Sequence, residues 1–139
     1  MLQRMQSLWL LLAAIAAFLT IRLSFYSGNF GENGQPTSFQ YLTAGFNIWI
    51  LILTIALVCV GAIDIFLYKN RKLQGRLALL GILISLFNIF LYYKQTLRFD
   101  AGNYDLTALL ALLIPVCFFL AMRGIYKDQK LIKSLDRLR

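Results

Sequence analysis

Apolar residues gather in four long stretches that short polar segments separate. The stretches cover residues 7–26, 41–68, 77–97 and 106–122. A helix of about 20 apolar residues crosses the roughly 30 Å of hydrocarbon in a bilayer, and each stretch is close to that length. Membrane-spanning strands would instead show alternating segments of about ten residues, and no such alternation occurs. The pattern predicts an all-α membrane protein with four transmembrane helices in an up-down bundle.

A different pattern closes the chain after this predicted bundle (residues 1–122). On a helix, five aliphatic side chains of residues 123–139 gather on one side and five cations on the other. The aliphatic residues are Ile125, Leu131, Ile132, Leu135 and Leu138, and the cations are Arg123, Lys127, Lys130, Lys133 and Arg137. Such a short helix needs a surface on which to bury its apolar side. We expect a cytoplasmic amphipathic helix that contacts anionic lipid, with a partner's groove or the bundle's own inner loop as alternatives.

Composition agrees with a membrane protein. Hydrophobic residues make up 60% of the chain and charged residues 14%, and the mean hydropathy is +0.69. A length of 139 residues suffices for one bundle of spans but not for an additional soluble domain. A net charge of +8 would suggest nucleic-acid binding in a soluble protein. Here the cations lie beside apolar stretches, where membrane topology accounts for them, so we expect no nucleic-acid partner.

The distribution of cations also predicts orientation. Eleven of the fourteen lysines and arginines fall on one side of the predicted spans. They are Arg4, Lys69, Arg71, Lys72, Arg76 and the six cations of residues 123–139, against Arg22, Lys94 and Arg98 on the other side. Because cytoplasmic loops are enriched in such residues, we expect both termini in the cytoplasm and the protein in a bacterial inner membrane.

The seven tyrosines mark the predicted ends of the spans. Tyrosine rings favour the membrane interface, where the ring meets the acyl chains and the hydroxyl meets the head groups. We expect this placement for Tyr26, Tyr41, Tyr68, Tyr92, Tyr93, Tyr104 and Tyr126.

The first stretch also resembles a secretory signal, since Arg4 precedes an apolar run. No clear small-residue cleavage site follows Thr20, which favours a retained span. The outer loop SGNFGENGQPTSFQ (residues 27–40) is rich in glycine and asparagine, which indicates turns and a flexible tether or lid. In the second outer connection, Asp100 and Asp105 are candidates to pair with arginine.

Three segments together resemble a known family. The opening MLQRMQSLWLLLA, the inner connection KNRKLQGRL and the closing KDQKLIKSLDRLR are similar to signature segments of a family of small bacterial membrane proteins described as a domain of unknown function. The resemblance extends over nearly all of the chain. It implies a four-helix inner-membrane protein of Gram-negative bacteria, and it implies no activity.

Asp64 is the one acid within an apolar stretch, and an ionisable residue in a membrane is a candidate functional site. It precedes Lys69 by five residues, or about 7 to 8 Å of helix rise. We therefore expect it near the inner boundary, paired with Arg4, Lys69 or Arg71. A proton or ion relay is the alternative role.

Other polar candidates carry less weight. Asn88 lies near the middle of the third stretch, where its amide needs a partner on a neighbouring helix. Packing is the favoured role and substrate contact the alternative; Asn47 and Arg22 are further candidates near the outer ends of spans. Cys59 and Cys117 are single and deep, which favours a packing role over redox chemistry.

Cofactor chemistry has little support. The chain contains no histidine, the usual ligand of haem and zinc, and two separate cysteines do not replace it. We expect no cofactor or metal. The leading functional hypothesis is an accessory or structural subunit of a membrane complex, in contact with a membrane-protein partner or a second copy. A small oligomeric transporter or channel that uses Asp64 and Asn88 is the alternative, and a membrane enzyme ranks last.

Overall fold

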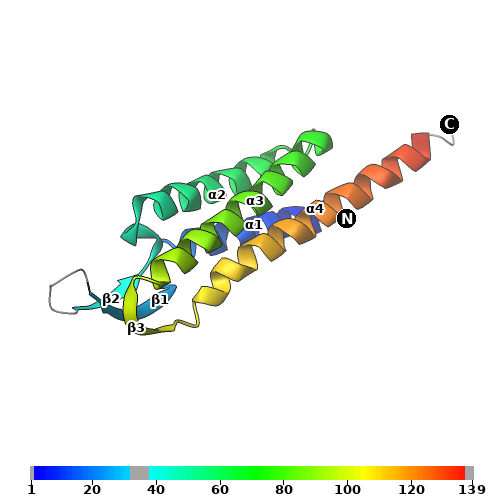
Figure 1. The fold of residues 1–139 in the computed structure, drawn as a ribbon. Coiled ribbons are helices and arrows are strands. Elements are labelled where there is room, and N and C mark those ends of the chain that lie inside the picture. Colours follow the sequence, from blue (N-terminus) through cyan, green and yellow to red (C-terminus); the bar gives the residue numbers. More distant parts are fainter. Residues whose placement is uncertain (1, 32–37, 137–139) are drawn as a thin grey trace.

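A computed structural model describes residues 2–31 and 38–136, with the side chains of residues 5–31 and 38–134. The elements follow the order α1 (Leu2–Leu19), β1 (Tyr26–Phe30), β2 (Ser38–Leu42), the 3-10 turn η1 (Ala44–Phe46), α2 (Ile48–Phe66), α3 (Arg71–Thr96), β3 (Phe99–Tyr104) and α4 (Ala108–Asp136) (Figure 1). The protein is thus mostly helical, as predicted. The expectation of an all-α fold is wrong, because a small sheet is present.

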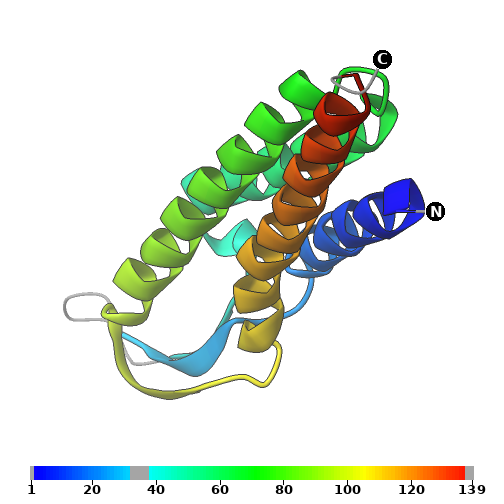
Figure 2. The ribbon, with the colours of Figure 1, turned by 90° about the vertical axis from the view of Figure 1, so that its right-hand side faces the viewer.

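The four helices pack side by side. The main contacts join α1 to α2 and α4, and α3 to α2 and α4. The start of α1, the α2–α3 turn and the end of α4 lie at one end of the bundle, and the sheet lies at the other (Figures 1 and 2). We call these the basic end and the sheet end. Of the eleven cations counted above, nine belong to the described segments at the basic end, and Arg137 and Arg139 lie outside the described residues.

Three of the helices are long and apolar enough to cross a membrane: α2, α3 and the portion of α4 from Ala108 to Ser134. The apolar part of α1, Met5–Leu19, is shorter. The predicted first span continued to residue 26, but the chain turns at Thr20–Leu23 and then enters β1. The predicted second span began at residue 41, whereas α2 begins at Ile48 because the preceding residues form the end of β2 and η1.

The sheet is antiparallel in the order β2-β1-β3. It unites the two connections that were predicted as a tether and a short loop. Gly28 lies opposite Gly102, where a Cβ would come within 2.7 Å of the facing backbone Cα, so glycine at both positions permits the pairing of β1 with β3. Strands of five or six residues depend on partners distant in sequence, which a local pattern does not reveal.

Two apolar clusters form the interior. One lies among the helices and contains Leu10, Leu57 and Phe118. The other joins the sheet to α2 and α3 and contains Tyr26, Ile50, Tyr92 and Phe99 among its members. Tyr92 is 1% exposed and its ring stacks on Phe25 at 4.7 Å, so this tyrosine, one turn before the end of α3, packs inside the bundle and not on its surface. The polar tip of this ring lies inside the bundle.

The predicted tail is the continuation of α4, which runs without a break from Ala108 through Asp136. At 1.5 Å per residue its 29 residues extend about 44 Å, and its end projects beyond the α2–α3 turn (Figure 1). Ile125 is buried in the bundle, whereas Leu131 and Ile132, further along the same helix, are exposed, so only the first of these residues packs against the bundle. Lys127, Lys130 and Lys133 are exposed. The side chain of Leu135, and Arg137 and Leu138 entirely, lie outside the described residues.

Candidate functional site

Asp64 lies in the last turn of α2 and is 0% exposed. Neither oxygen of its carboxyl group has a hydrogen-bond partner among the described residues. Gln74 of α3 donates to the backbone carbonyl of Asp64 at 3.2 Å and leaves the carboxyl group unbonded. Of the predicted partners, Arg71 is paired with Asp128 instead, at 3.6 Å. The predicted pairing with Arg71 is therefore wrong, whereas the side chain of Arg4, another predicted partner, lies outside the described residues. The position in the last turn of α2, two residues before the helix ends, agrees with the expected place near the end of the span.

The surroundings make this position costly for a bare negative charge. Burying an ionised carboxylate without a partner costs far more than burying a bonded one. The C-terminal turn of a helix adds to the cost, because its carbonyl groups concentrate partial negative charge there. The carboxyl group of Asp64 is therefore favourable here only in its protonated form or with a cation beside it, and the described residues provide it with no hydrogen bond.

A bonded polar network surrounds the same end of the bundle. Gln6 of α1 donates to the carboxylate of Asp128 in α4 at 2.8 Å. The same carboxylate pairs with Arg71 at the start of α3, and Gln129 donates to the backbone carbonyl of Arg71 at 2.7 Å. We call these four residues the basic-end network. Together with Gln74 and Asp64, it places polar groups from all four helices at the basic end.

Close packing brings α1 and α4 together at this network. A Cβ on Gly124 would come within 2.8 Å of the Cγ of Gln6. A larger residue at 124 would therefore push α1 away from α4 and lengthen the bond from Gln6 to Asp128.

A second group of polar side chains lies nearer the sheet end. Asn88 donates to the hydroxyl of Thr54 at 3.1 Å, which confirms the predicted bond to a neighbouring helix. The hydroxyl of Tyr92 lies beside the side chains of Thr20 and Thr54. Two buried atoms there lack a hydrogen-bond partner within the described part of the chain: Oδ1 of Asn88 and Oε1 of Gln95. We call Thr54, Asn88, Tyr92 and Gln95 the sheet-side cluster. Its two unbonded atoms are acceptors for a small polar guest or water.

The two polar regions do not form one site. Thr54, the partner of Asn88, precedes Asp64 by ten residues, or about 15 Å along α2. An apolar layer lies between them: Leu57 is fully buried, and the ring of Phe118 packs on Gly81 so closely that a Cβ there would lie 2.7 Å from it. The interior is closed between the two polar regions.

The core-facing side of α3 connects both regions. Its buried residues are Gln74, Gly75, Ala78, Gly81, Ser85, Asn88, Tyr92, Gln95 and Thr96, spaced mainly three or four apart. The outward side carries large apolar residues, among them Leu83, Leu86 and Phe90. A helix at the surface of a soluble protein buries its apolar side and exposes its polar side. Helix α3 has the opposite arrangement, which suits a helix surrounded by lipid.

The remaining predicted residues have local roles. Asn47 caps α2, its side chain accepting a bond from the backbone N–H of Trp49 at 3.0 Å. Arg22 is exposed in the turn after α1. Asp105 accepts bonds from Ser24 and Ser27 instead of pairing with arginine. None of these joins the two polar regions.

Gln6, Gln74, Asp128 and Gln129 were not predicted as site residues. Asp128 was counted among the charges of the tail. The sequence does indicate that Asp128 is buried. It continues, at the same spacing, the buried stripe of α4 that contains Ile114, Phe118, Ala121 and Ile125. An acid on the core-facing side of a helix requires a partner, here Gln6 and Arg71.

Comparison with known proteins gives the family but no activity. No curated protein and no solved structure matches the chain. A family model described as "Domain of unknown function (DUF4293)" matches residues 2–138, nearly the whole sequence. The chain therefore belongs to the DUF4293 family of unknown function.

Proposed function

We propose that the protein is a small multi-pass membrane transporter that moves a proton or another small cation, with Asp64 as the group that accompanies the cation. The observation that supports this most strongly is the fully buried carboxyl group of Asp64, whose two oxygens have no partner among the described residues. Ionisable groups inside membrane segments are rare because they are costly, and they typically mark ion or proton pathways.

The path assigned to the cation follows α3. Gln74, Ser85, Asn88 and Gln95 face the bundle interior along this helix. The packing of Phe118 on Gly81 separates the two polar regions, so the conformation is a closed one. Movement of α4 relative to α3 would open this contact, and alternating opening toward the two ends is the proposed transport cycle.

The hypothesis of an accessory subunit has no comparably specific support. Large apolar side chains are exposed on all four helices and not on a single face. Surrounding lipid accounts for such a distribution without a protein partner. Co-purification of a larger complex after mild extraction would restore this hypothesis.

Proton flux into liposomes tests the proposal. Purified protein is reconstituted with an internal pH-sensitive dye, and a potassium diffusion potential drives cation entry; uptake of radioactive sodium and rubidium extends the test to other cations. We expect flux above that of empty liposomes, and a decrease on the order of tenfold in Asp64→Asn. Asp100→Asn is the matched control, since it removes an exposed acid near the sheet end. Absence of flux for all three cations, or equal flux in Asp64→Asn, contradicts the proposal.

A further inference from the structure

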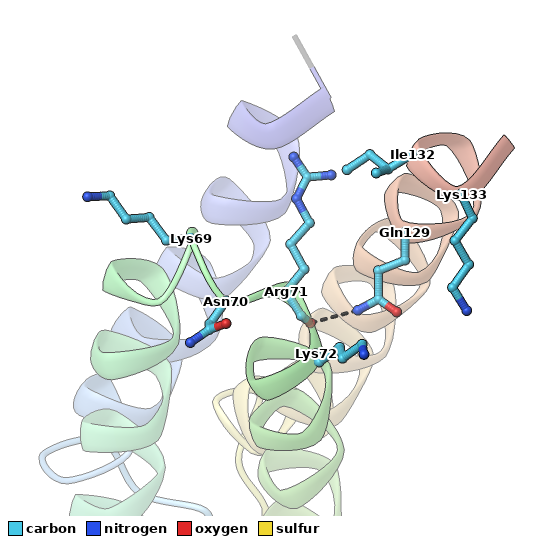
Figure 3. Close-up of a pocket in the computed structure, with 7 residues that line it drawn as sticks. All are labelled: Lys69, Asn70, Arg71, Lys72, Gln129, Ile132 and Lys133. Atoms are coloured by element: carbon cyan, nitrogen blue, oxygen red, sulfur yellow. Dashed lines mark hydrogen bonds between the residues drawn. The ribbon is translucent and has the colours of Figure 1, made fainter. Parts of the chain in front are cut away.

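A pocket of about 470 Å³ opens at the basic end, between the α2–α3 turn and α4. Four of its lining residues are cations: Lys69, Arg71, Lys72 and Lys133. Gln129 crosses from α4 to the backbone carbonyl of Arg71. Lys72 lies just below this bond and Lys133 lies beside Gln129 on α4, whereas Lys69 extends away from α4 (Figure 3). Four of the seven residues that line the pocket therefore carry a positive charge.

This charge is only partly neutralised. Asp128 pairs with Arg71 at 3.6 Å and also accepts the bond from Gln6. Among the side chains that the structure describes, which exclude Asp136, no acid forms an ion pair with Lys69, Lys72 or Lys133. The charges of Lys72 and Lys133 attract an anion to this hollow, because the repulsion between the two lysines decreases when an anion lies between them.

The pocket also offers hydrogen-bond donors. The amide of Asn70 lines the hollow, and its side chain makes no capping bond to the first turn of α3. The first turn of α3 contains no acidic residue, so its backbone N–H groups add positive partial charge to that of the lysines. A tetrahedral oxyanion such as phosphate matches this combination of charge and donors.

Apolar side chains beside the pocket favour a phosphate that carries acyl chains. Ile132 lines the hollow and is exposed, and Phe66 and Leu73, close in sequence to the turn, are exposed as well. Phe66 is the last residue of α2 and Leu73 lies in the first turn of α3, which is the depth of the head groups if the helices span the bilayer. We propose that this pocket binds the phosphate of an anionic phospholipid, with Lys72 and Lys133 as its main cationic contacts.

Native mass spectrometry of detergent-purified, delipidated protein tests the site. Phosphatidylglycerol is titrated against phosphatidylcholine, and inorganic phosphate is added in a separate arm. We expect one retained phosphatidylglycerol in the wild type. In Lys72→Gln with Lys133→Gln its affinity should be roughly 30-fold lower, since each cation near an anionic lipid contributes about fivefold. The matched control is Lys94→Gln with Arg98→Gln, which removes two charges near the sheet end and should bind like the wild type.

Circular dichroism confirms that each variant retains its helices. Equal phosphatidylglycerol binding by the pocket variant and the wild type overturns the proposal, as does an equal loss in the control variant. Retention of phosphatidylcholine to the same extent also overturns it, because charge would then play no part. Displacement of the lipid by millimolar inorganic phosphate would assign the site to free phosphate and overturn the lipid assignment. The site is independent of Asp64, so Asp64→Asn should bind the lipid unchanged.

Discussion

Asp64 and Asp128 are two buried acids with opposite surroundings. Asp128 accepts a bond from Gln6 and faces Arg71, whereas the carboxyl group of Asp64 has no partner among the described residues. Removal of one partner from a bonded buried pair leaves the other partner unsatisfied, which is destabilising. Removal of an unbonded acid relieves a cost instead. The two residues should therefore respond oppositely to neutralisation.

We predict that Asp64→Asn raises the thermal unfolding midpoint in detergent, while Asp128→Ala lowers the free energy of unfolding by about 2 to 4 kcal/mol. The loss in Asp128→Ala arises because the Gln6 amide and the Arg71 guanidinium lose their shared acceptor. Thermal denaturation followed by circular dichroism measures both changes. A midpoint in Asp64→Asn that falls as far as in Asp128→Ala would show that Asp64 is a structural acid.

At this scale the sequence identified Asp64 and the bond of Asn88, but not the surroundings of either acid. The apolar stretch around Asp64 indicated its location in a membrane segment. Arg71, one of its predicted partners, pairs with Asp128 instead. These two residues are 57 positions apart in the sequence, so local spacing does not predict their pairing. The role of Asp128 was not predicted, because many other charged residues lie near it in the sequence.

Helix α3 is the element on which both polar regions depend. It presents Gln74, Asn88 and Gln95 to the interior and packs against α2 and α4. Gly81 allows the ring of Phe118 to approach, which closes the interior between the polar regions. The contact is therefore important both for stability and for the proposed closed state.

Gly81→Ala should lower the free energy of unfolding by about 1 to 3 kcal/mol, because the added methyl group overlaps the ring of Phe118. Addition of Phe118→Leu should recover part of the loss, since it removes the ring atoms that the methyl group meets. Thermal melts of the single and double variants measure the coupling. Purely additive effects of the two substitutions would contradict the assigned contact.

Elements with strong local patterns were predicted well, and those with long-range partners were not. Runs of apolar residues indicated the three long helices that meet the length and hydropathy of a membrane span. The sheet was missed because β1 pairs with β2 across a glycine-rich loop and with β3 across two helices. The predicted tail helix exists as far as Asp136. The sequence becomes polar at Arg123, and this change gave no indication that the tail continues the last apolar helix without a break.

The whole molecule has distinct ends. The basic end contains the α2–α3 turn, the end of α4 and the proposed phosphate site, and the sheet end contains the paired strands. All four helices expose large apolar side chains, while polar side chains lie inside. We propose that α1 is a fourth span and that the basic end faces the cytoplasm, since nine of the twelve cations in the described residues belong to it.

Reporter fusions test this topology. Fusions after Arg76 and Arg139 should be cytoplasmic, and fusions after Gln35 and Gly102 should be periplasmic. A periplasmic reporter after Arg139 would contradict the four-span arrangement, and a cytoplasmic reporter after Gln35 would show that α1 does not cross the membrane.

The central claim is that Asp64 is an enclosed carboxyl group through which a cation moves. A hydrophobic carbodiimide tests it directly, because this reagent enters the bilayer and modifies carboxyl groups in apolar surroundings. Proteoliposomes are treated, and the modified residues are identified by mass spectrometry while cation flux is measured in the same sample. We predict that Asp64 is modified, that exposed Asp100 is not, and that flux falls in proportion to the modified fraction. Modification of Asp64 without loss of flux, or no modification of Asp64 at all, would contradict the account.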